Sequence, residues 1–106
     1  MNGQYRVIPT ATFQQDIERL EEHIVQRDLS SNTPDDACLF WFRDALERAM
    51  GILSFAPHTC RRSEAHRAFR ELIVPFGHGG SVVLFTVRDL DVVLLAARDQ
   101  HESDYR

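Results

Sequence analysis

The residues best suited to chemistry gather near the end of the chain. Arg98, His101 and Tyr105 follow directly after the apolar segment 91–97, and Arg70 stands at the start of an earlier apolar segment. A histidine can donate or accept a proton near neutral pH, and arginines can stabilise the charge that develops on a phosphate. A strand that delivers such side chains to one end of a sheet is a natural location for function. These four residues form the candidate catalytic group.

Each of the four also has a structural alternative. Arg70 could pair with its neighbour Glu71, and an ion pair at the surface contributes less than about 1 kcal/mol. Arg98 could bind an acid of the tail, and His101 could be a solvated tail residue. Tyr105 could pack its ring on the helices. The sequence leaves both interpretations of each residue open.

Length and composition predict one domain over residues 1–106. The chain is 43% hydrophobic, which is enough for a single modest core. No apolar run approaches the roughly 20 residues that span a bilayer, and the N-terminus lacks the basic-then-apolar pattern of a signal peptide. We therefore expect no membrane association and a cytoplasmic location.

The cysteines and histidines do not form a metal-binding pattern. In a reducing compartment, Cys38 and Cys60 are expected to be free thiols. Although His58 lies close to Cys60, a zinc site needs about four ligands in matched pairs, which the sequence does not supply. We expect neither a metal nor a cofactor.

The charge pattern separates an acidic region from a basic one. All 12 cationic residues are arginine, which excludes any mechanism that requires a lysine base. The net charge of −4 argues against broad binding to nucleic acid, which depends on clustered cations. Seven acids stand against two arginines in residues 12–36, whereas four arginines stand against one acid in residues 57–70.

The first half of the chain predicts a short strand and two helices. Residues 5–8 suit a first or edge strand that stops at Pro9. A capping box from Thr12 to Gln15 predicts a helix that begins there and ends near Asp28. Thr33 and Pro34 predict the start of a second helix that runs to about Phe55. The two helices should pair as an antiparallel hairpin. The expected core stripe of the second helix is Leu39, Phe42, Leu46, Ala49 and Leu53.

The second half predicts three strands at residues 69–74, 81–87 and 91–97. A basic irregular loop should precede them, and a glycine-rich turn at residues 76–80 should join the first two. The spacing of residues 88–91 is that of a hairpin turn. The predicted fold is α+β, with the helical hairpin covering one face of a mostly antiparallel sheet.

In this order and at this length, these segments resemble the ParE/RelE toxin superfamily. The resemblance rests on the opening YRV strand, the acidic first helix, a DALERAM-like second helix that ends in F-x-P, R-E-L and the V-V-L-F-T-V strand. It also rests on the C-terminal motif R-H-Q-R-E-x-D-Y, which stands here as Arg98 to Tyr105. Asp99 replaces the histidine of that motif, and His101 replaces its second arginine. Arg70 matches the arginine that the family carries on its second strand.

The resemblance implies a toxin of a type II toxin–antitoxin system, of the kind that stabilises plasmids. In the ParE branch such toxins bind and poison DNA gyrase without being enzymes, and this branch fits the acidic chain better. The RelE branch implies a ribosome-dependent mRNA endoribonuclease that would use Arg70, Arg98, His101 and Tyr105. A third alternative is an inactive member that acts only as a binding module.

A cognate antitoxin is the partner that the resemblance implies. Phe40 lies opposite the core stripe of the second helix, so it should be exposed beside Trp41. An acidic amphipathic partner would satisfy this apolar surface together with the basic residues of the following loop. The expected partner-binding residues are Phe40, Trp41, Arg61, Arg62 and Arg67.

Overall fold

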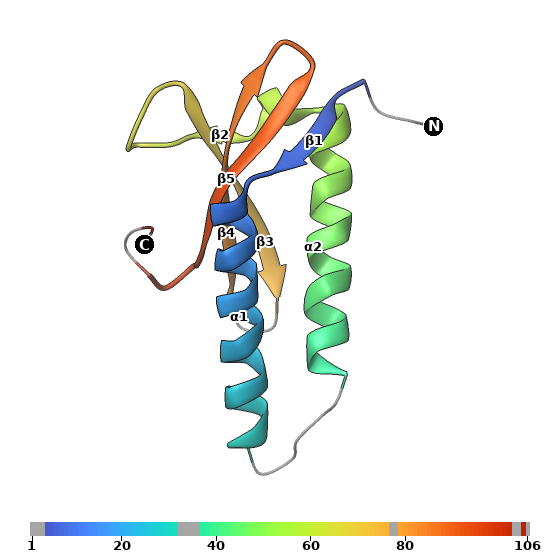
Figure 1. Cartoon of the computed structure of the whole chain (residues 1–106), viewed down its shortest axis with the longest axis vertical. Helices are drawn as coiled ribbons and strands as arrows, with labels where there is room; N and C mark the ends of the chain where they lie inside the picture. Colours follow the sequence, from blue (N-terminus) through green and yellow to red (C-terminus); the bar gives the residue numbers. More distant parts are fainter. Residues whose placement is uncertain (1–3, 32–36, 77–78, 103–104, 106) are drawn as a thin grey trace.

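The computed structural model describes residues 4–31, 37–76, 79–102 and 105. It contains two α-helices and a five-stranded sheet (Figure 1). In chain order the elements are β1 (Arg6–Pro9), α1 (Ala11–Leu29), α2 (Cys38–Phe55), the short 3₁₀ helix η1 (Pro57–Thr59), β2 (Arg61–Arg62), β3 (Phe69–Phe76), β4 (Gly79–Arg88) and β5 (Asp91–Asp99). The predicted α+β class is therefore confirmed.

The sheet has the order β1-β5-β4-β3-β2. β1 pairs with β5 in parallel, and all other neighbours are antiparallel. The two helices form a hairpin that packs on one face of this sheet, with α1 against β5 and α2 against β3 (Figure 1). The core lies between these layers, and its most deeply buried side chains include Phe42, Leu53, Val74, Phe85 and Leu94.

Helix α1 begins earlier than the capping box predicts. Thr10 is the N-cap residue, and its hydroxyl accepts a hydrogen bond from the Phe13 N–H at 3.2 Å. The same hydroxyl donates to the Leu94 carbonyl of β5 at 2.7 Å, so it joins the helix start to the sheet. Thr12 lies inside the first turn and is exposed. The prediction that Thr12 caps the helix is therefore wrong, because the contact with β5 favours Thr10.

Helix α2 follows its predicted pattern closely. Phe42, Ala49 and Leu53 are buried, and Leu39 and Leu46 are partly buried. The helix ends at Phe55, as predicted, and Pro57 opens η1 directly after it. The helix begins at Cys38, with Ala37 as its N-cap, which is later than the start at Thr33 and Pro34 that the sequence predicts; Thr33 and Pro34 lie outside the described residues.

Strands β3 and β4 extend further than predicted. Pro75 and Phe76 belong to β3, where they pair with Gly80 and Gly79. Proline is tolerated in a strand whose outer edge has no neighbour, and β2 pairs only with Arg70 and Glu71 of β3 in the described part of the chain. A Cβ atom at Gly80 would lie 2.5 Å from the Val74 carbonyl oxygen, so only glycine permits this close pairing.

The basic segment before β3 is more ordered than predicted. Residues 57–59 form η1, and Arg61 and Arg62 pair with Glu71 and Arg70 as the short edge strand β2. β4 and β5 are joined through Asp89 and Leu90, as the hairpin spacing predicts. Asp89 has a φ of 53°, a left-handed conformation that aspartate tolerates better than most residues.

The two threonines at the start of α1 provide a test of this arrangement. We expect Thr10→Ala to lower the free energy of unfolding by about 1–2 kcal/mol, because it removes both the cap and the contact with Leu94. Thr12→Ala should change it by less than about 0.5 kcal/mol, since Thr12 is exposed. Urea denaturation of both variants measures the difference. Equal losses would show that Thr10 has no special role.

Candidate functional site

Two of the four candidate catalytic residues meet on the sheet face that points away from the helices. Leu72 and Val74 of β3 enter the core below the helices, so the alternating residue Glu71 faces the other side. There Glu71 accepts a hydrogen bond from the Tyr105 hydroxyl at 2.7 Å. The Arg98 guanidinium lies 4.0 Å from the same carboxylate and 5.2 Å from the centre of the Tyr105 ring.

The side chains of this cluster are largely committed to each other and to the backbone. Arg98 donates to the Glu102 carbonyl at 2.6 Å and lies within 3.5 Å of the carbonyls of Asp99 and Gln100. Its side chain is only 13% exposed, and that of Glu71 is 11% exposed. Arg61 occupies the second oxygen of Glu71 at 3.0 Å. The cluster therefore holds the C-terminal segment against the sheet.

Burial raises the pKa of Tyr105 above its ordinary value. The hydrogen bond to Glu71 and the charge of that carboxylate raise it further, whereas Arg98 lowers it. The phenol is therefore held in its protonated form, in which it donates to Glu71. A tyrosine held in this way is a poor general base at neutral pH.

Arg70 and His101 do not join this cluster. Arg70 donates to the carbonyls of Cys60 at 2.7 Å and His58 at 3.3 Å, so it holds the segment that contains η1 and β2. In β3 it alternates with Glu71, which places the two residues on opposite faces of the sheet. His101 lies beside Gly79, near a pocket on the helix side. The structure thus brings together Arg98 and Tyr105 only.

Where β1 ends, side chains take over the hydrogen bonding along that edge of β5. β1 ends at Pro9 opposite Leu94, and no other described strand lies along this edge. Asp16 of α1 accepts a hydrogen bond from the Ala97 N–H at 2.9 Å. Glu102 accepts one from the Asp99 N–H at 3.0 Å and pairs with Arg19 at 3.0 Å. Side chains of α1 and the tail thus replace the missing strand.

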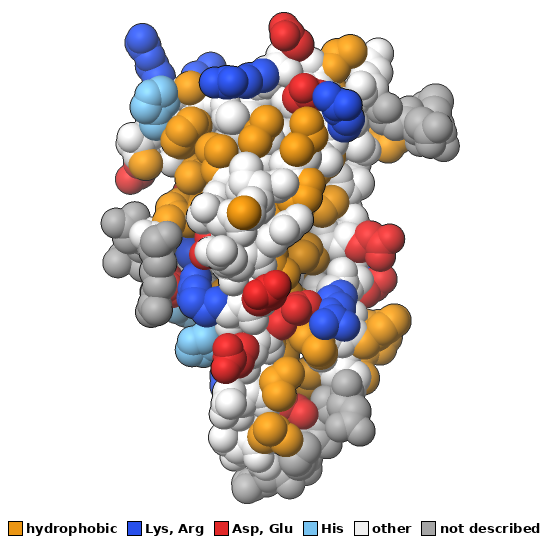
Figure 2. Space-filling model, in the orientation of Figure 1, with side chains coloured by type: hydrophobic (Ala, Val, Ile, Leu, Met, Phe, Trp, Pro, Cys, Tyr) orange, Lys and Arg blue, Asp and Glu red, His pale blue; other side chains and the backbone are white. Residues whose placement is uncertain are grey.

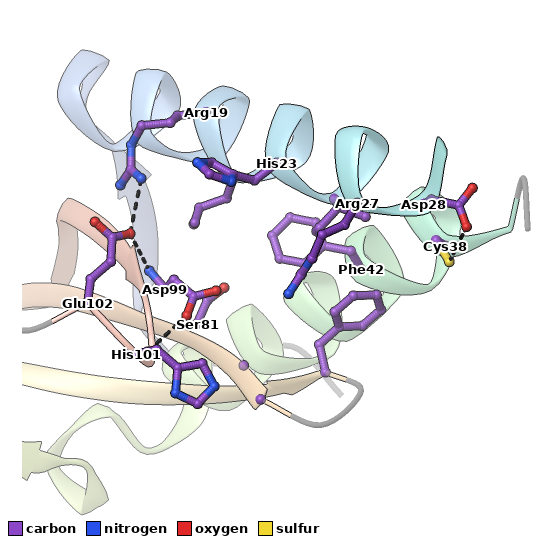
Figure 3. Close-up of a pocket in the computed structure, with 15 residues that line it drawn as sticks. Arg19, His23, Arg27, Asp28, Cys38, Phe42, Ser81, Asp99, His101 and Glu102 are labelled. Carbon is purple, nitrogen blue, oxygen red and sulfur yellow. Dashed lines mark hydrogen bonds and ion pairs between the residues drawn. The ribbon is translucent and has the colours of Figure 1, made fainter. Parts of the chain in front are cut away.

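A pocket of about 600 Å³ lies next to this edge, between α1 and the sheet. Its apolar floor contains Leu20, Ile24, Phe42 and Phe76. Figure 3 shows Arg19, His23 and Arg27 on the α1 wall, whereas Asp99, His101 and Glu102 lie on the wall of the sheet and tail.

Of these pocket residues, only His101 was a functional candidate from the sequence, whereas Phe42 was expected as part of the core stripe of the second helix. A signal was nevertheless present, because residues 16, 19, 23 and 27 recur at steps of three and four and so share one flank of the helix.

The residues predicted to bind a partner are exposed. Phe40 and Trp41, 61% and 52% exposed, pack edge to face in the first turn of α2. Figure 2 shows apolar side chains over this lower part of α2 and arginines along the upper rim of the molecule. Arg61, Arg62 and Arg67 are also exposed, and they follow the other end of α2. The two groups of residues are therefore separated by the length of the helix.

Both cysteines are free thiols. Burial raises the pKa of Cys60, which makes it a weak nucleophile at neutral pH. Across the described ranges, no group of three or more His, Cys, Asp or Glu side chains is placed to hold a metal ion. Neither α1 nor α2, as far as they are described, combines the length and apolar content needed to cross a bilayer.

No protein-family model matches the chain, and no curated protein matches its sequence.

The hydrogen bond between Tyr105 and Glu71 predicts a pH-dependent stability. Tyr105→Phe should lower the free energy of unfolding by about 1 kcal/mol at pH 7, because it leaves one oxygen of Glu71 without its donor. Since folding raises the pKa of Tyr105, this contribution should be complete below the ordinary value of 10.0 and decline as the pH rises beyond it. Denaturation of both proteins from pH 7 to 11 measures the difference. A difference that grows with pH would contradict this account.

Proposed function

We propose that this chain is the toxin of a type II toxin–antitoxin system, of the ParE kind. In this proposal it arrests growth by binding DNA gyrase, is not an enzyme, and is neutralised by a cognate antitoxin protein. The element order of the fold is compatible with this assignment. The resemblance of the C-terminal motif from Arg98 to Tyr105 supports the same family.

The distance between the candidate catalytic residues favours a binding function over catalysis. A ribonuclease needs its acid, its base and its cationic group around one phosphate. Here Arg70 and His101 lie away from the pair formed by Arg98 and Tyr105, and Arg98 is occupied by tail carbonyls. This arrangement favours a protein that acts through its surface over an mRNA endoribonuclease.

The composition of the motif agrees with this choice. The histidine that the resemblance expects is Asp99, whose carboxylate accepts the His101 backbone N–H at 2.9 Å. An anion at this position would repel RNA phosphate. The absence of lysine and the net charge of −4 are further departures from a basic RNA-binding groove.

The exposed face of α2 supports an elongated partner. Trp41, Ile52 and Phe55 lie on one side of the helix, at spacings close to whole turns, and each is about half exposed. A hollow of about 300 Å³ joins Ile52 to Arg61 of β2 and Ile73 of β3. An acidic amphipathic segment laid along α2 would contact the apolar stripe and then the basic segment.

Expression of the chain without a partner tests the target. We expect growth arrest in which incorporation of labelled thymidine falls before that of labelled methionine, because a gyrase poison stops replication first. His101→Ala should arrest growth equally well, since no catalytic step depends on it. Both incorporations should be followed from the moment of induction.

The other outcomes identify the alternatives. If methionine incorporation falls first and His101→Ala is harmless to cells, the protein is a ribosome-dependent ribonuclease. If the folded chain arrests nothing but still binds its antitoxin, it is an inactive member that serves as a binding module. If it does neither, the toxin assignment is wrong.

The antitoxin interface can be tested by charge reversal. The double variant Arg62→Glu and Arg67→Glu should weaken binding of the cognate antitoxin by at least about tenfold, because it reverses a surface expected to receive an acidic partner. Arg61 is left intact because it pairs with Glu71. Arg88→Glu is the control, since Arg88 is an exposed arginine that lines neither of the two hollows. Calorimetric titration that shows equal affinity for wild type and double variant would remove the basic segment from the interface.

A further inference from the structure

The pocket between α1 and the sheet combines an apolar floor with nitrogen donors on two walls. His23 and Arg27 come from α1, and His101 comes from the tail (Figure 3). Leu20, Ile24 and Phe42 are buried in the floor, and Phe76 packs edge to face on Phe42 with ring centres 5.6 Å apart. A volume of about 600 Å³ lies in the range of sites that hold small organic ligands.

The acids on the pocket walls already have donors. Glu102 binds Arg19 and the Asp99 N–H, and Asp99 accepts the His101 N–H. Asp28 accepts a hydrogen bond from the Cys38 thiol at 3.6 Å. These contacts leave the acids less able to bind a cationic ligand.

Arg27 differs from these acids. Within the described residues, its guanidinium forms neither a hydrogen bond nor an ion pair, although it lines the pocket. The imidazoles of His23 and His101 likewise form no hydrogen bond to another described residue. A guanidinium and two imidazoles around an apolar floor match a ligand with an anionic head and an apolar body.

We propose that this pocket binds a small amphipathic organic anion, with its anionic head at Arg27 and its apolar body over Ile24 and Phe42. The site lies on the helix side of the sheet, whereas the cluster of Glu71, Arg98 and Tyr105 lies on the other side. It uses none of the partner-binding residues named above. The proposal therefore goes beyond the proposed function and does not depend on it.

Matched eight-carbon probes separate the contributions of charge and apolar contact. Octanoate, octan-1-ol, octylamine and inorganic phosphate would each be titrated into the full chain, and amide shifts would be followed by NMR. We expect octanoate to bind with a Kd on the order of 1 mM or tighter, shifting amides of α1 and the start of β4. Octanol, octylamine and phosphate should each bind about tenfold more weakly or not at all.

Two arginine variants locate the anionic head. Arg27→Gln should weaken octanoate binding about tenfold, because it removes a charge-assisted hydrogen bond. Arg88→Gln removes the same charge from an exposed arginine at the far end of β4 from Gly79, so it should leave the affinity unchanged. Thermal denaturation checks that both variants fold.

The two cysteines give an independent readout of occupancy. Cys38 lines the pocket, whereas Cys60 lies outside it. Saturating octanoate should slow alkylation of Cys38 by iodoacetamide severalfold while leaving the rate at Cys60 unchanged, as measured by mass spectrometry of the peptides.

Several results would overturn the proposal. Equal binding of octanol would show a purely apolar cavity, and tighter binding of octylamine would show that the acids determine the charge preference. Phosphate binding as tight as octanoate binding would remove the role of the apolar floor. Equal loss in Arg27→Gln and Arg88→Gln, or no saturable shift of pocket amides up to about 10 mM octanoate, would also reject it.

Discussion

Beyond Leu94, the edge of β5 that faces away from β4 needs hydrogen-bond partners that no described strand supplies. Buried N–H and C=O groups without partners cost free energy comparable to a lost hydrogen bond, so an uncovered edge under a helix would be unstable. Thr10 and Asp16 of α1 meet this requirement at Leu94 and Ala97, and Glu102 of the tail meets it at Asp99. Because these contacts are directional, they fix where α1 lies along the sheet and where the chain goes after β5.

The same contacts determine the two surfaces on either side of the sheet. With α1 held over β5, its flank carrying Arg19, His23 and Arg27 becomes a wall of the pocket. With Glu102 held at the β5 edge, its carbonyl reaches Arg98, which faces the opposite side beside Tyr105. The polar C-terminal residues are thus mostly used to complete the fold. The exposed surface is what the proposed binding function would use.

Local periodicity predicted the parts of the structure that depend on local sequence. The stripe of α2 and the alternating strands were predicted because burial of one face imposes a period of about 3.6 or 2 residues. Thr10 was missed because Thr10 and Thr12 are both good caps locally, and only the distant Leu94 carbonyl distinguishes them. The extension of β3 past Pro75 depends on Gly80 across the hairpin, which the local rule for proline does not include.

The candidate site was predicted in part for a similar reason. Arg98 and Tyr105 follow one buried strand, so the motif placed them close together. Arg70 shares its alternation with the core residues Leu72 and Val74, which already indicates that it faces the helices rather than Arg98. Asp16 lies three residues after Phe13 and four before Leu20, next to the apolar stripe. Its burial could therefore also have been predicted from the sequence. The hydrogen bond that Asp16 accepts could not be predicted, because it depends on where β1 ends along β5, and only the structure shows that.

The pairing of the arginines indicates which parts of the surface are available to bind an anionic ligand or partner. Arg6, Arg19, Arg43, Arg48, Arg61 and Arg98 each form an ion pair with an acid. Among the described residues, Arg27, Arg62, Arg67, Arg70 and Arg88 form none. Arg70 donates to backbone carbonyls, whereas the other four are exposed. An unpaired arginine keeps its full capacity to bind an anion, whereas a paired one must first give up its partner.

The exposed unpaired arginines lie at three places: the pocket, the basic segment, and the start of the turn between β4 and β5. Arg27 also lies beside apolar surface, at Ile24. The basic segment meets apolar surface at Ile52 through Arg61, which is paired with Glu71. The combination of unpaired cation and apolar surface is what an amphipathic acid recognises, whether it is a small molecule or a protein segment.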